Sequence, residues 1–169
     1  MTLAFLLCST KPLQTSAAVP SDLEPVVKQL RMATAYTNFS VVDVVPIRVQ
    51  EGKNTEQKAQ VPGLSEVEGN PASVDIRILP DAIVRKEADR YVRFQWIRVN
   101  FRIPYMTSLM KQAASGAQPA LAATQFNIRE VGINTSGDFK EGQKTVLGKI
   151  SGVNEDSALF VVVSVKILD

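Results

Sequence analysis

The segment Ala158–Leu168 constrains the fold of this chain more than any other. Its odd-numbered residues form one apolar row: Leu159, Val161, Val163, Val165 and Ile167. On the opposite face, Phe160 and Val162 give way to Ser164 and Lys166. A period of two residues indicates a β-strand, and a strand that is apolar on both faces needs cover on both. We therefore expect this segment in the centre of a sheet.

Other segments share the β-branched, alternating pattern of strands. They span residues 39–49, 73–79, 91–103, 125–131 and 145–150, the last one following a Gly-containing turn at 138–144. Within 91–103, the apolar residues fall on even numbers up to Trp96 and on odd numbers from Ile97, which predicts a β-bulge. Pro46 marks an edge strand or a bulge. The polar stretch 51–70 is predicted to be a mobile connection or a long hairpin tip, and 106–124 a loop with at most a short helix.

One helix is predicted near the N-terminus. Ser21 and Glu24 have the spacing of a capping box, and the apolar residues that follow recur at helical intervals up to about Ala35. The fold class is therefore mainly β (α+β), with one N-terminal helix packed on an antiparallel sheet or β-sandwich of about six strands. Residues 19–169 have the length of a single domain.

Residues 1–18 are predicted to form a signal or targeting segment. Leu3–Cys8 is apolar, and Ser16 and Ala18 are small residues that suit the positions before a signal-peptidase cut. This predicts a bacterial periplasmic or secreted protein. Lipid attachment at Cys8 is less favoured because Leu7 before it is not small, and a disordered cytosolic tail is the remaining alternative. No apolar run is long enough to predict a transmembrane span.

The composition argues against catalysis and metal binding. The chain has no histidine, which is the usual general base near neutral pH and a common metal ligand, and only one cysteine. Phosphate-binding glycine loops and calcium loops are absent, and Asp43 is a carboxylate inside an apolar strand that we expect to face solvent or pair with Arg48 or Arg77. We expect no enzyme, no catalytic residue, no cofactor, no metal site and no small-molecule substrate.

A basic strand is the strongest candidate for an interaction face. Residues 85–111 carry seven Lys/Arg and two Asp/Glu, and the polar residues of the strand alternate with aromatic rings. The predicted face comprises Arg93, Gln95, Arg98, Asn100 and Arg102. Such a mixture binds single-stranded nucleic acid when the rings and cations share a face. Because alternation sends them to opposite faces, we favour an amphipathic strand with its rings in the core and its arginines in water. The working surface for a protein partner is expected to be a sheet edge or this arginine face.

The C-terminal part carries a resemblance to known proteins. Glu141–Lys149 followed by Ala158–Val163 resembles the G-Q-x-V-x-x-G hairpin of outer-membrane secretins, and a set of small uncharacterised exported bacterial proteins with this ending. The resemblance implies a location in the bacterial envelope. We therefore expect an exported, non-catalytic β-domain that acts as a structural or protein-interaction module with an envelope partner. The alternatives are a secretion-system or pilus-associated component, a carboxylate-only hydrolase and a nucleic-acid-binding module.

Overall fold

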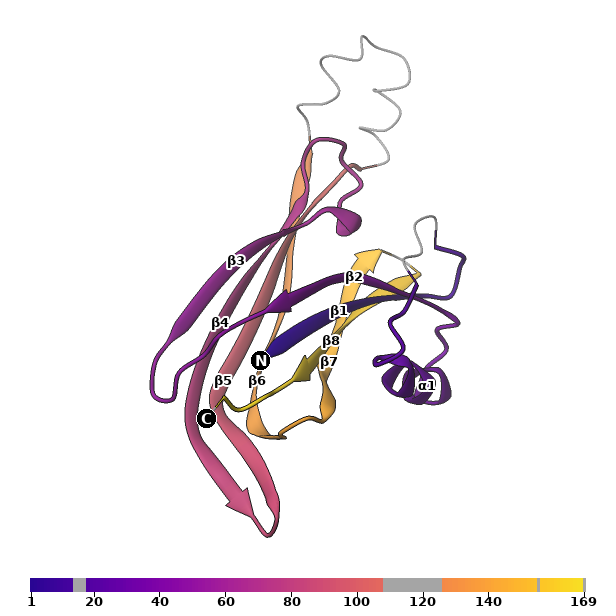
Figure 1. Ribbon diagram of the computed structural model, residues 1–169. Coiled ribbons are helices and arrows are strands. Elements are labelled where there is room, and N and C mark those ends of the chain that lie inside the picture. The colour runs from indigo at the N-terminus through magenta and orange to yellow at the C-terminus, as the bar shows by residue number, and fades with distance from the viewer. Residues whose placement is uncertain (14–17, 108–125, 155, 169) are drawn as a thin grey trace, which may run out of the picture.

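The protein is described by a computed structural model that covers residues 1–13, 18–107, 126–154 and 156–168 (Figure 1). In these ranges the chain forms two antiparallel four-stranded sheets. Sheet A contains, in spatial order, β2 (Asn38–Pro46), β1 (Thr2–Ser9), β8 (Ser157–Ser164) and β7 (Lys144–Asn154). Sheet B contains β3 (Thr55–Val61), β4 (Ala72–Lys86), β5 (Asp89–Tyr105) and β6 (Asn127–Lys140). The mainly β class is confirmed.

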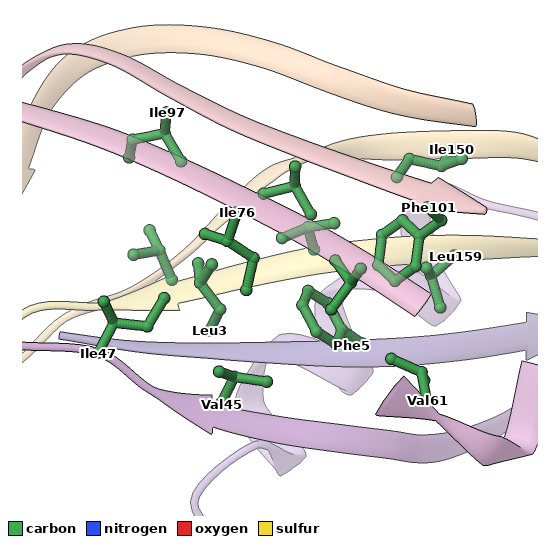
Figure 2. Packing of buried hydrophobic residues seen from close by; sticks show 14 of the residues in the cluster. Leu3, Phe5, Val45, Ile47, Val61, Ile76, Ile97, Phe101, Ile150 and Leu159 are labelled. Carbon is green, nitrogen blue, oxygen red and sulfur yellow. The ribbon is translucent and has the colours of Figure 1, made fainter. Parts of the chain in front are cut away.

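The main core lies between the two sheets, as Figure 2 shows. Phe5 on β1 meets Phe101 on β5 edge to face, with 5.0 Å between the ring centroids. Both rings are fully buried, as are Leu3 on β1 and Ile76 on β4. Burial of one such side chain contributes about 1.5–3 kcal/mol, so these contacts hold the two sheets together.

A second core lies on the other face of sheet A, under the helix α1 (Glu24–Ala33) (Figure 1). The helix buries Val26, Val27 and Leu30 against a layer of sheet residues that includes Leu6 and Phe160. Sheet A is therefore covered on both faces. This confirms that the C-terminal strand is central, with β8 between β1 and β7, although it ends at Ser164.

The predicted capping box is wrong. The N-cap of α1 is Leu23, and no side chain caps the helix. The backbone N–H of Leu23 donates to the carbonyl of Pro20 at 2.9 Å, and that of Glu24 donates to the carbonyl of Ser21 at 3.3 Å. A hydrogen-bonded backbone turn thus precedes the helix, in place of a side-chain cap. At the other end, the hydroxyl of Thr34 donates to the carbonyl of Leu30 at 2.7 Å.

Two strands lie where the sequence predicted none. β3 lies inside the polar stretch 51–70. Its residues have low intrinsic β-propensity, and pairing with β4 over the whole length of the strand keeps them extended. β1 lies inside the expected targeting segment 1–18, paired with β2 on one side and β8 on the other. A cut after Ala18, which the targeting pattern predicts, would take this strand out of sheet A. Ser16 and most of the predicted connection 106–124 lie outside the described residues.

The predicted bulge is confirmed. The β5–β6 register shifts between Phe94 and Ile97, and β4 carries a matching irregularity between Leu79 and Ala82. Pro46 ends the edge strand β2, as predicted. The strand predicted at 125–131 continues as β6 to Lys140, and the turn after it, with Gly142 at φ +75°, leads from sheet B to sheet A. No helix among the described residues is long and apolar enough to cross a membrane.

Candidate interaction face

The five residues predicted for the interaction face all lie on one surface. Arg93, Gln95, Arg98, Asn100 and Arg102 are exposed on the side of β5 that faces away from sheet A, whereas Phe94 and Phe101 on the opposite side are buried in the core. We call this surface the outer face of sheet B. The α-helix of the described chain lies on sheet A instead (Figure 1).

The neighbouring strands add charges of both signs to this face. The register places across it seven cations (Lys58, Arg77, Lys86, Arg93, Arg98, Arg102 and Lys140) and six carboxylates (Glu56, Asp75, Asp81, Asp89, Glu130 and Asp138) among the described residues. The local excess of basic residues seen in the sequence is thus nearly balanced in space. A face of this kind has no strong general attraction for phosphate.

Most of the arginines on this face already have carboxylate partners. Arg102 lies 3.0 Å from Glu130, and Arg77 lies 3.2 Å from Glu56 and 3.3 Å from Asp75. The hydrogen bond and charge of Asp75, with a smaller effect of Glu56, raise the pKa of Arg77. Exposed pairs of this kind contribute only about 0–1 kcal/mol each, so they shape the electrostatics more than the stability.

Arg98 is bound differently. Its guanidinium lies over the indole ring of Trp96, 5.0 Å from the ring centroid, and no carboxylate of the described residues lies within 4.0 Å of it. Trp96 is half-buried and stands opposite Leu79 on β4, which is also half-buried. The bulge brings Trp96 to the outer face. Trp96 and Leu79 thus form an apolar spot in the middle of a polar face, and the guanidinium of Arg98 lies over its indole ring.

A charged cluster occupies the end of the same face, near the β4–β5 turn. Asp138 accepts hydrogen bonds from Arg93 at 2.8 Å and from Lys86 at 2.9 Å, and Lys86 also lies 5.2 Å from the centre of the Tyr91 ring. The hydrogen bonds from Arg93 and then Lys86 hold the pKa of Asp138 well below its usual range. Sequence reasoning missed Asp138, because only the pairing of β5 with β6 brings it opposite Arg93.

Asp138 makes the stability of the protein depend on pH at the acid end. Because its pKa is depressed in the folded state, its stabilisation is fully present above the unfolded pKa of about 3.9, declines as the pH falls below that value, and is lost as the pH falls through the lower folded-state pKa. We expect Asp138→Asn to cost about 1 kcal/mol at pH 7 and distinctly less near pH 2, where the carboxyl group is protonated in the unfolded chain. Urea unfolding at both pH values measures this. Glu130→Gln, whose ion pair is well exposed, is the matched control and should show little effect at either pH.

Three other groups that could carry chemistry, Asp43, Cys8 and Lys144, have structural contacts. Asp43 is half-exposed and accepts a hydrogen bond from the backbone N–H of Val44 at 2.8 Å. Burial raises the pKa of the Cys8 thiol to about 12, in the core under the helix. A cleft of about 360 Å³ lies beside the start of α1, and its cation Lys144 donates to the carbonyl of Asp22 at 2.7 Å and to the Asp22 carboxylate.

Comparison with known proteins finds no relative. No family model, no curated protein and no solved structure matches this chain. Clusters of three or more Cys, Asp or Glu side chains that could hold a metal do not occur in the part of the chain that the structure describes. The outer face of sheet B, with its Trp96–Arg98 pair, therefore remains the best-defined candidate surface.

Proposed function

We propose that this protein is a non-catalytic structural or protein-interaction module of the bacterial cell envelope, and that it works through the outer face of sheet B. The observation that carries this proposal is the Trp96–Arg98 pair, with Leu79 beside it, on a face with balanced charge. Trp and Arg are the residues most enriched at the energetic centres of protein interfaces. The partner should present a carboxylate for Arg98 next to an apolar side chain for Trp96.

A periplasmic or secreted location is part of the proposal. It rests on the resemblance of the β7–β8 hairpin to exported proteins and on the targeting pattern of residues 1–18, which we take to act without being removed because β1 is part of sheet A. The burial of Cys8 in β1 counts against lipid anchoring there, because a lipid-bearing residue would have to leave the core. The hairpin resemblance also supports the alternative of a secretion-system or pilus-associated component.

The other two alternatives have less support. A nucleic-acid-binding face needs cations that are free for phosphate, and Arg77, Arg93 and Arg102 are engaged with carboxylates. A carboxylate-only hydrolase needs one carboxyl group that stays protonated near neutral pH. Asp138 has the opposite shift, because its cationic neighbours lower its pKa.

A capture experiment with matched variants tests the proposal. The full chain is used as bait on solubilised envelope, and bound proteins are identified by mass spectrometry. We expect a protein that binds the wild-type chain and the Lys28→Glu variant, which changes an exposed residue of α1, but not the Trp96→Ala or Arg98→Glu variants. Equal capture by all four chains would contradict a role for this face, and tight oligonucleotide binding at low salt would favour the nucleic-acid alternative.

A further inference from the structure

The described sheets have four edge strands, and three of them carry features that discourage a further strand. On β2, the backbone N–H of Val44 donates a hydrogen bond to the Asp43 side chain, and Pro46 has no N–H. The edges β6 and β7 are tied together, because Arg129 on β6 donates to the carbonyl of Val153 on β7 at 2.8 Å. Bulges, Pro and bound backbone groups are the usual protections of a sheet edge.

The fourth edge, β3, is protected only by its charged side chains, Glu56 and Lys58. It pairs with β4 in unbroken register from Thr55 to Val61, without Pro, Gly or a bulge. Figure 1 shows β3 at the margin of sheet B, and no described strand is hydrogen-bonded to its free side, although β2 of sheet A contacts it. A regular strand of this kind offers a row of backbone donors and acceptors to another strand.

The sequence around β3 is complementary to itself when it is read in opposite directions. Glu56, Lys58 and Gln60 lie on the outer face, and Thr55, Gln57 and Ala59 lie on the inner face. In an antiparallel pair of two β3 strands centred on Gln57, each Glu56 stands opposite the Lys58 of the second copy. The same register sets Asn54 opposite Gln60 on the outer face and Thr55 opposite Ala59 on the inner face. Each pairing joins residues of one face, as the pleat requires.

Charge selects this register over its neighbours. Centring the pair on Glu56 or on Lys58 would place two like charges directly opposite each other, which is destabilising. Lys58 is available for the contact: its side chain is 71% exposed, and its nearest carboxylate, Glu56, is 3.9 Å away. Glu56 lies closer to Arg77, at 3.2 Å, so the ammonium of Lys58 is only weakly neutralised within its own chain.

We propose that two copies of this chain pair through β3, antiparallel and with the two-fold axis at Gln57. The two B sheets then form one continuous sheet whose outer faces lie side by side. The contact is short, so the dimer is of the weak, transient class, and its paired charges make it sensitive to salt. This pairing uses the edge of sheet B rather than the Trp96–Arg98 spot, so it stands or falls independently of the proposed function.

Charge variants test the pairing. Sedimentation velocity over a range of concentrations at low salt should show a monomer–dimer equilibrium for the wild-type chain. Lys58→Glu and Glu56→Lys should each weaken self-association by about tenfold or more, because each sets like charges opposite one another at both contacts. A mixture of the two variants should recover the dimer, because one strand then carries two cations and the other two carboxylates. Lys28→Glu is the control and should dimerise like the wild type.

A disulfide across the two-fold axis gives a second readout. Directly opposed residues of antiparallel strands have Cα atoms about 4.5–5.5 Å apart, which lies within the range that a disulfide spans. Gln57→Cys should therefore form a linked dimer under mild oxidation, whereas Ala59→Cys, on the same face, should not. Cys8 is buried and does not compete. The proposal is overturned if the wild-type chain stays monomeric at all concentrations, or if both cysteine variants cross-link at the same rate.

Discussion

A chain that lacks residues 1–18 is expected not to fold. This truncation removes β1, on which Leu3, Phe5 and Leu6 are fully buried, and burial of these three side chains alone contributes roughly 5–9 kcal/mol. That is comparable with the whole stability of a typical domain, which is about 5–15 kcal/mol. β2 would also lose its only sheet partner among the described strands.

Far-UV circular dichroism and thermal melting of the truncated chain measure this effect. We expect the full chain to melt in one cooperative transition and the chain that begins at Val19 to show none. A truncated chain with the same spectrum and a cooperative melt would contradict the place of β1 in sheet A, and would leave the targeting role of residues 1–18 as the better account. The mass of the protein isolated from its host provides an independent check, since we expect residues 2–9 to be retained.

The second large effect is expected at Gly132 on β6. A Cβ atom there would lie 2.6 Å from the backbone oxygen of Val99 and even closer to the side-chain oxygen of Asn100. The exposed Asn100 side chain can rotate away, but the strand backbone at Val99 cannot, so Gly132→Ala should cost about 1–3 kcal/mol.

Urea unfolding of the Gly132→Ala variant gives this value directly. Gly148 on β7 provides the control, because the nearest side-chain atom to a Cβ there is at 3.6 Å, an ordinary contact. Gly148→Ala should therefore change the unfolding free energy much less. Equal losses of unfolding free energy for the two variants would contradict the closer contact of β5 with Gly132.

The sequence predicted the parts of the fold in which a local pattern and the tertiary environment agree. Alternation identified β8 and β5, and the phase change at Trp96 located the bulge because a bulge is itself a local irregularity. The exposed side of β5 followed from the same alternation. These features need no knowledge of the partner strands.

The missed features depend on neighbours that are distant in sequence. β1 is a short, continuously apolar run, which periodicity alone cannot separate from the core of a signal segment. β3 is polar and becomes a strand through β4. At the face itself, the cations of β5 were predicted, but the carboxylates that balance them come from β3, β4 and β6. Only the sheet register reveals that Arg98 lies over Trp96, whereas the other arginines of this face have carboxylate partners.

Site-specific photo-cross-linking in the bacterial cell tests the central claim most directly. A photoreactive amino acid is placed at Trp96 in one chain and at Lys28 on α1 in another, and the cross-linked products are compared. The claim predicts a discrete product with another envelope protein from position 96, and none from position 28. It is contradicted if position 96 yields no product, or if both positions yield the same one.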